Sequence, residues 1–386
     1  MTIGTIASGI VFIVCIVLAA EKSAEPIFPP EMRLAALPSR APEPCDNSAT
    51  PEKLALGRLL FFDPILSAKN DVACATCHHP KLGWSDGRAA PIGAGGTGIG
   101  PDRKFREANT LQPLTRNTPT ILNAAFNGLV SGAKLDPATS PMFWDSRVQS
   151  LEAQVLTPIQ SRDEMRGDAC LESEAVEQAL RRLRAIGEYR GLFSAAFGKP
   201  ADAAITAEHL AKAIAAFERT LITTDSPFDR FMRGDTSALN AGQQRGLRVF
   251  QNAGCIQCHG GPMLSDYKLH FIGVPDAPAG RREFRTPTLR NLHHTAPYMH
   301  NGSLRTLRDV LIFYEELMDA VGETLDGADD FARPRLDPLL KQINVNAADF
   351  PALEAFLDAL NDDRYDKTEP SKMPSGLPVG GVTSEW

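Results

Sequence analysis

The strongest constraint in this sequence is a five-residue pattern, Cys-x-x-Cys-His, that occurs at residues 74–78 and again at residues 255–259. This pattern is the attachment signature of c-type haem: two thiols at this spacing can bond both vinyl groups of a porphyrin, and the adjacent histidine presents an imidazole nitrogen to the iron. A disulfide redox pair or half of a zinc site would also use Cys-x-x-Cys. Two copies that both end in histidine favour haem. The sequence therefore predicts two covalently bound haem c groups, held by Cys74, Cys77, His78, Cys255, Cys258 and His259.

Length and composition indicate a globular protein of two domains. The chain has 386 residues, of which 43% are hydrophobic and 23% charged, values typical of proteins with a substantial core. The net charge of −7 gives no reason to expect nucleic acid as a partner. Runs of β-branched residues that would indicate strands are scarce, so we expect a mostly helical fold.

The N-terminal segment, residues 1–22, is apolar and is followed by small residues. It is predicted to be a secretory signal peptide, with an uncleaved anchor as the alternative, and membrane attachment is expected only in that second case. Export together with haem c predicts a periplasmic protein. The cysteines outside the motifs and this segment, Cys45 and Cys170, would be free to pair in an oxidising compartment, but the sequence leaves their pairing open.

The chain between the export segment and its end divides into two haem domains. Residues 23–49 are rich in proline, alanine and glutamate and are predicted to be a linker. Thr50 followed by Pro51 is a typical helix start. Helical apolar spacing recurs at residues 171–187, 206–222, 243–250, 304–318 and 351–360. We expect an N-terminal haem domain over residues 50–230, a C-terminal haem domain over 231–366 and a loose tail over 367–386.

The two halves repeat each other. The segment Thr-Pro-Thr-Ile-Leu-Asn at 118–123 returns as Thr-Pro-Thr-Leu-Arg-Asn at 286–291. Asp145 and Leu151 return as Asn301 and Leu307, at an offset of 156 in both cases. Such self-similarity indicates one structural unit used twice. The expected fold is mostly α, with two cytochrome c-type haem domains in tandem related by a pseudo-two-fold axis.

At this point the chain resembles the bacterial di-haem cytochrome c peroxidases and their MauG-like relatives. Besides both haem motifs, the resemblance rests on Leu-Phe-Phe-Asp-Pro at 60–64, Arg-Asn-Thr-Pro-Thr at 116–120, Phe-Trp-Asp at 143–145 and Thr-Ala-Pro-Tyr-Met-His-Asn-Gly at 295–302. These motifs are specific in combination. The resemblance implies that the N-terminal haem meets peroxide and that the C-terminal haem relays electrons.

The resemblance also implies roles for single residues. Trp144 matches the tryptophan between the haems, and His300 matches a histidine near them. Gln154 and Glu164 match the two polar residues over the peroxide-binding iron. This fits the chemistry, because heterolysis of a bound hydroperoxide needs a group that moves a proton between its oxygens, and Glu164 can do so while Gln154 orients the peroxide.

A calcium ion between the domains is implied in the same way. Asn117, Thr295 and Pro297 match the family's calcium site. Side-chain amide and backbone carbonyl oxygens are suitable ligands for this hard cation.

The axial ligands set this chain apart from many peroxidases of the family, which carry a histidine in the loop after the first haem motif. No histidine lies between His79 and His209, so the first haem is predicted to be high-spin and open to peroxide. The offset of 156 makes Tyr314 the counterpart of Pro158. The resemblance agrees, since Tyr314 falls where peroxidases have a ligating methionine and MauG-like enzymes a tyrosine. Tyr314 is therefore the predicted second ligand of the C-terminal haem, with Met318 as the alternative.

The predicted function is that of a periplasmic MauG-like di-haem enzyme. Such an enzyme uses hydrogen peroxide to form a high-valent di-haem state and oxidises a residue, typically tryptophan, of a partner protein. The alternative is a cytochrome c peroxidase that draws electrons from a small c-type cytochrome. A di-haem electron carrier is disfavoured, because a carrier needs both irons capped.

Overall fold

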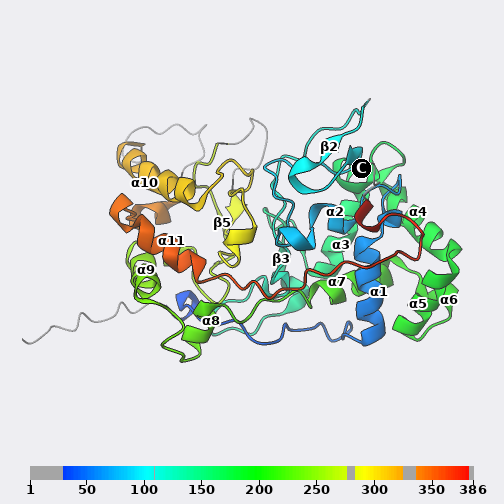
Figure 1. Ribbon diagram of the computed structural model, residues 1–386, viewed down its shortest axis with the longest axis horizontal. Helices are drawn as coiled ribbons and strands as arrows, with labels where there is room; N and C mark the ends of the chain where they lie inside the picture. Colours follow the sequence, from blue (N-terminus) through cyan, green and yellow to red (C-terminus); the bar gives the residue numbers. More distant parts are fainter. Residues whose placement is uncertain (1–28, 108, 276–282, 325–335, 382–386) are drawn as a thin grey trace, which may run out of the picture.

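The computed structural model describes residues 29–107, 109–275, 283–324 and 336–381, without the side chains of 318–324. The predicted signal segment lies outside the described residues. The described chain forms two helical lobes at the ends of the long axis, with loops and short strands between them (Figure 1). The prediction of a mostly helical protein is confirmed. Among the described residues, no helix combines the length and apolar character needed to cross a membrane.

The N-terminal lobe is built on the helix that the sequence placed at Thr50. The Lys53 N–H donates to Thr50 Oγ1 at 3.2 Å, which is the expected N-cap. The predicted helix at 171–187 is present as Glu172–Ala185, and a further helix, Gly187–Phe197, follows it directly. The sequence analysis missed the helix that contains Pro158, because proline inside a helix usually argues against one. The helices of this lobe are α1 (Pro51–Phe62), α2 (Cys74–Cys77), α3 (Leu151–Gln160), α4 (Glu172–Ala185), α5 (Gly187–Phe197), α6 (Ala201–Ala204) and α7 (Ala207–Glu218).

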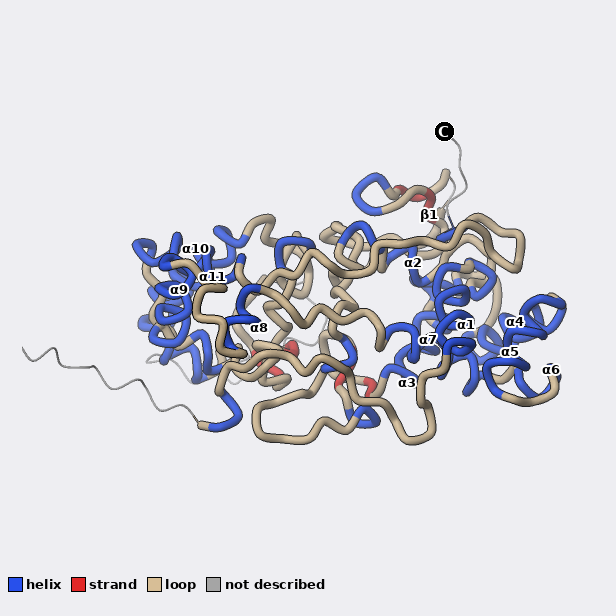
Figure 2. The backbone as a smooth tube through the Cα atoms, turned by 60° about the horizontal axis from the view of Figure 1, so that its bottom comes forward, coloured by secondary structure: helices blue, strands red, loops and turns tan. Residues whose placement is uncertain are grey.

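The C-terminal lobe contains fewer helices among the described residues. Its helices are α8 (Pro227–Met232), α9 (Ala241–Asn252), α10 (Leu307–Thr324) and α11 (Phe350–Asp358). Three antiparallel two-stranded ribbons complete the described chain: β1 (Gly96–Thr97) with β2 (Lys104–Phe105), β3 (Pro141–Met142) with β4 (Val148–Gln149), and β5 (Leu269–His270) with β6 (Phe284–Arg285). In Figure 2 loops make up most of the middle of the molecule, between the helices of the two lobes.

Each lobe is held by the same close crossing of two helices. A Cβ built on Gly57 of α1 would lie 1.9 Å from the Ala213 carbonyl oxygen of α7. A Cβ on Gly246 of α9 would lie 1.9 Å from the Ala352 carbonyl oxygen of α11. Backbone therefore packs directly on backbone in both lobes, an approach that only glycine allows.

The repeat with offset 156 is also present in the structure. Met142 pairs with Val148, and Tyr298 pairs with Leu304, 156 residues later. The helices that follow begin at the same offset, α3 at Leu151 and α10 at Leu307. Pro158 on α3 and Tyr314 on α10 are therefore structurally equivalent.

The two lobes are joined at Thr223. Its hydroxyl accepts hydrogen bonds from the side-chain amides of Asn123, at 2.6 Å, and Asn291, at 2.7 Å. These asparagines end the repeated Thr-Pro-Thr segments, and both have left-handed backbone conformations, with φ of 63° and 62°. One residue thus binds the same position of both repeats, as expected near a pseudo-two-fold axis.

The C-terminal segment is a strap, so the prediction of a loose tail over 367–386 is wrong as far as Gly381. The segment runs from the C-terminal lobe back across the N-terminal lobe to α2 (Figure 1). The Ser375 hydroxyl donates to Asp63 at 2.7 Å, and the Thr76 hydroxyl donates to the Gly380 carbonyl at 2.6 Å. Met373 is buried in the N-terminal core. A segment rich in proline and glycine is irregular here but firmly packed.

The N-terminal segment is packed as well. Within the predicted linker over 23–49, the described residues from 29 onward include Leu37, which is buried and donates its N–H to Asp229 at 2.9 Å. The Asn47 amide donates to Glu152 on α3 at 2.7 Å. Cys45 and Cys170 are both free thiols, so the pairing left open by the sequence does not occur in the structure.

Replacing glycine with alanine should have opposite effects on stability at the helix crossings and at an open position of a helix. Gly57→Ala and Gly246→Ala should each destabilise the protein by about 1–3 kcal/mol, because the added methyl group forces a pair of helices apart. Gly191 lies in α5, and no atom lies within 4 Å of the position that a Cβ would take there, so Gly191→Ala should stabilise by about 0.5–1 kcal/mol. Denaturant unfolding of the three variants measures these values. Equal effects at Gly57 and Gly191 would contradict the close crossing.

Candidate functional site

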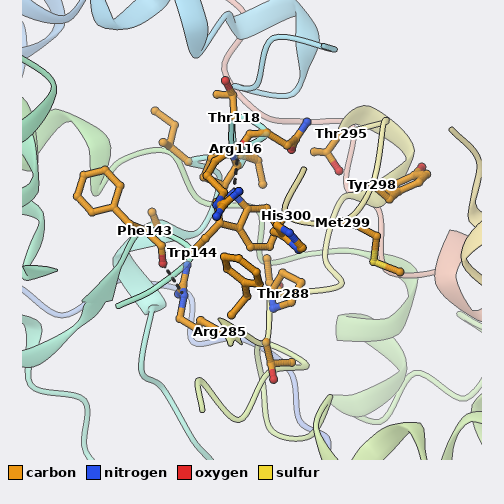
Figure 3. A pocket seen from close by; sticks show the side chains of 18 of the residues that line it. Arg116, Thr118, Phe143, Trp144, Arg285, Thr288, Thr295, Tyr298, Met299 and His300 are labelled. Carbon is orange, nitrogen blue, oxygen red and sulfur yellow. Dashed lines mark hydrogen bonds between the residues drawn. The ribbon is translucent and has the colours of Figure 1, made fainter. Parts of the chain in front are cut away.

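Both Cys-x-x-Cys-His motifs line one continuous cavity of about 650 Å³. Its walls come from both lobes and from the loops between them. Figure 3 shows side chains of both repeats meeting in this cavity, among them Trp144, Arg285 and His300.

The two motif histidines are oriented as haem ligands require. The Nδ1 of His78 lies 3.1 Å from the Trp84 carbonyl oxygen, and the Nδ1 of His259 lies 3.0 Å from that of Leu264. A proton on Nδ1 that is donated to a carbonyl leaves the lone pair of Nε2 for a metal. Burial lowers the pKa of His78 to about 4 and also lowers the pKa of His259, so both rings are neutral at pH 7.

The cysteines of the motifs complete a donor set that fits haem c. Cys74, Cys77, Cys255 and Cys258 are all free thiols on the cavity wall. Burial raises the pKa of Cys74, Cys77 and Cys255, so these thiols are protonated at pH 7. Two thiols and one imidazole held through Nδ1, repeated in each lobe, are what two covalent haem groups need.

The wall between the two motifs is formed around Trp144. Its indole N–H donates to the Asn117 carbonyl at 2.8 Å, and its own carbonyl accepts the Arg285 N–H at 2.6 Å. The ring of His300 stacks on Phe284 with the ring centroids 3.7 Å apart. Residues from both repeats therefore hold Trp144 on the cavity wall, and its position between the haems stays a prediction.

The predicted peroxide-side residues lie together on the cavity wall. Gln154 and Pro158 come from α3, and Glu164 comes from the π-helical turn that follows, Arg162–Arg166. The loop after the first haem motif packs tightly on this turn, since a Cβ on Gly93 would lie 2.4 Å from the Glu164 carbonyl oxygen. Burial raises the pKa of Glu164, which brings its carboxyl closer to the range where it can both accept and donate a proton.

Tyr314 is placed at the second motif. It lines the cavity together with Cys255, Cys258 and His259, and burial together with these cysteines raises the pKa of its phenol. No described residue forms a hydrogen bond with its hydroxyl, although a buried tyrosine usually finds a partner. The side chain of Met318, the alternative ligand, lies outside the described residues.

The predicted calcium ligands lie on the same cavity but are already engaged. Asn117, Thr295 and Pro297 all line it. The Asn117 amide donates to the Arg88 carbonyl at 2.7 Å, and the Thr295 hydroxyl donates to the Leu292 carbonyl at 3.4 Å. Calcium binding stays a prediction.

Two ionisable residues of the cavity were missed by the sequence analysis. His270 lines the cavity between Asp266, at 2.9 Å, and Asp337, at 2.5 Å. Hydrogen bonds with Asp266, Cys258 and Asp337 raise the pKa of His270 to about 11. Glu218, at the end of α7, is buried on the same cavity. The sequence offers only one hint of Glu218, namely that a single acidic residue follows a run of apolar residues.

Comparison with known proteins agrees with this geometry. Residues 51–237 match the family described as di-haem cytochrome c peroxidase. A methylamine utilization protein MauG of Methylorubrum extorquens is 36% identical over 350 residues, covering 87% of this chain and 84% of the relative. A cytochrome c551 peroxidase of Pseudomonas aeruginosa is 34% identical over 294 residues, covering 71% of this chain and 75% of the relative.

A solved structure shares the fold across most of the chain. It is that of a MauG-like protein associated with microbial copper homeostasis, with a TM-score of 0.65 and 28% identity, covering 85% of this chain and 95% of the other. The di-haem peroxidase BthA of Burkholderia thailandensis, at 23% identity and a TM-score of 0.59, shares the fold.

Proposed function

Because this chain belongs to the di-haem cytochrome c peroxidase family, whose members carry haem c and act on hydrogen peroxide, we propose that it is a MauG-like enzyme that oxidises a residue of a partner protein. Tryptophan is the proposed target residue. The periplasm is the proposed compartment, on the strength of the apolar segment over residues 1–22 and the haem c motifs.

The observation that carries this proposal is the position of Tyr314. Relatives named MauG and relatives named cytochrome c peroxidase match at similar identity, so the choice between them depends on the second haem. Tyr314 is equivalent to Pro158 and lies at the second motif with no described hydrogen-bond partner. An anionic phenolate oxygen favours oxidised iron, whereas a thioether raises the potential. A tyrosine ligand thus suits an enzyme that must hold a strong oxidant.

The alternative function is that of a cytochrome c peroxidase supplied with electrons by a small c-type cytochrome. The resemblance to the Pseudomonas aeruginosa enzyme favours it. The same residues would serve at the first haem in either case.

Residues of this chain have separate tasks in the proposed reaction. When bound, the two haems supply the redox chemistry. His78 and His259 hold the irons through Nε2, fixed by their Nδ1 hydrogen bonds. Gln154 orients hydrogen peroxide, and Glu164 takes a proton from one peroxide oxygen and gives it to the other. Pro158 leaves the peroxide position free, because its side chain has no ligand atom.

Trp144 is the proposed route for electrons between the lobes, and His300 lies on the same wall. Asn117, Thr295 and Pro297 are the proposed holders of a calcium ion there, through side-chain amide and backbone carbonyl oxygens. Such an ion would add to the contacts that hold the two haem groups in fixed positions relative to each other.

Tyr314 as ligand predicts a specific set of spectra. Oxidised protein should lack the far-red band of a thioether bound to ferric iron. Tyr314→Phe should change the low-spin spectrum of the second haem, because its phenolate ligand is gone, whereas Met318→Leu should leave that spectrum unchanged. A far-red band in the unsubstituted protein that disappears in Met318→Leu and persists in Tyr314→Phe would assign the ligand to Met318.

The choice of electron donor tests the proposed function itself. Protein treated with one equivalent of hydrogen peroxide and mixed with excess reduced small c-type cytochrome should oxidise it slowly. Rapid, sustained oxidation of the cytochrome with continued peroxide would support the alternative. Glu164→Gln serves as the control: it should slow the reaction with peroxide by roughly 10²–10⁴-fold while both haems stay bound, whichever donor is used.

A further inference from the structure

Glu218 is a buried carboxyl without a clear structural reason. It is the last residue of α7, is 5% exposed and lines the cavity at the first haem motif. Its Oε2 atom has no hydrogen-bond partner among the described residues. Burying a carboxyl in this way costs folding free energy unless something at the site compensates. The electrostatic influence of Glu218 on Cys74 places it close to the first haem attachment.

The repeat shows that the fold does not need this carboxyl. Phe217 and Phe356 are equivalent, since each contacts the glycine of the helix crossing in its own lobe. The next residue is Glu218 in the first lobe and Leu357 in the second, and both line the cavity. An apolar residue is therefore sufficient at this position of the repeat. Only the lobe proposed to react with peroxide carries an acid there.

A network of charged and polar side chains begins at the residue after Glu218. Arg219, the next residue, forms a two-fold hydrogen bond with Glu152 on α3, at 2.7 and 2.8 Å. The Asn47 amide also donates to Glu152, at 2.7 Å, and the Lys53 ammonium donates to Asn47 at 3.1 Å. Arg219 and Glu152 are the charged groups that act on Glu218, one favouring its ionised form and the other its protonated form.

Glu218 itself is poised between its two protonation states. Burial is the main cause that raises its pKa to about 8. At pH 7 the carboxyl is mostly protonated, and a nearby positive charge would favour its ionised form. Positive charge appears close by when a haem held at Cys74 is oxidised.

We propose that Glu218 is the group that exchanges a proton with solvent when the first haem changes its redox state. On one-electron reduction of the ferric haem, the Glu218 carboxylate binds one proton from solvent, and on reoxidation it releases that proton. The net charge at the buried site is thereby conserved. Glu218 acts in this proposal on the charge at the first haem, whereas Glu164 acts on the peroxide. This inference rests on the haem-binding part of the proposed function and is independent of the identity of the donor.

The test is the pH dependence of the midpoint potential of the first haem, followed through its high-spin absorbance bands. In the unsubstituted holoprotein the potential should fall with rising pH around pH 8, because the carboxylate stabilises the oxidised haem. In Glu218→Gln the potential should stay at its low-pH value through this range, and Glu218→Asp should restore part of the fall. Reduced-minus-oxidised infrared spectra should show a protonated carboxyl band that Glu218→Gln abolishes.

Controls separate this inference from its alternatives. Glu208→Gln, an exposed carboxyl on the same helix, should leave the pH dependence unchanged. Glu218→Leu, which copies Leu357, should fold, bind both haems and lose the pH dependence. An unchanged fall of potential in both Glu218→Gln and Glu218→Leu overturns the proposal, as does failure of both variants to bind haem, which would make Glu218 structural. Glu164→Gln slows the reaction with peroxide in any of these cases, so failure of this inference would leave the proposed function standing.

Discussion

Each lobe of this protein depends on a helix crossing in which backbone contacts backbone. Gly57 and Gly246 have no room for a Cβ, and the helices they contact carry Phe217 and Phe356 into the crossing. The crossing fixes the position of the haem motif that follows the first helix of each pair. Thr223 then joins the repeats by binding Asn123 and Asn291 with one hydroxyl. The two haem motifs, a helical turn at Cys74–Cys77 and a 3-10 turn at Cys255–Gln257, are in this way held on a common cavity.

The chemistry comes from the places where the repeats differ. The scaffold puts Pro158 and Tyr314 at equivalent positions, so one haem is expected to be open and the other closed. It also puts Glu218 and Leu357 at equivalent positions, so at this position of the repeat only the first lobe carries an ionisable side chain. The two copies of the repeated unit thus take different roles through single residue differences on equivalent helices. Trp144 lies on the wall of the cavity that both copies line.

The features that sequence reasoning predicted are local or periodic. The haem motifs, the Thr50 cap and the offset of 156 can all be recognised from the order of residues, and the structure places Tyr314 where that offset put it. The strap could not be predicted, because the partner of Ser375 is Asp63, far away in the sequence, and irregular backbone has no periodic signal. Glu218 was missed for a similar reason: its burial follows from which helices pack around α7.

The central claim is that one repeated scaffold holds one open and one closed haem in the same chain. Electron paramagnetic resonance of the oxidised protein tests it most directly, because five-coordinate and six-coordinate ferric haem give separate high-spin and low-spin signals. The account predicts one signal of each kind, each integrating to one haem per chain. Two low-spin signals, or spin equivalent to a single haem, would contradict it.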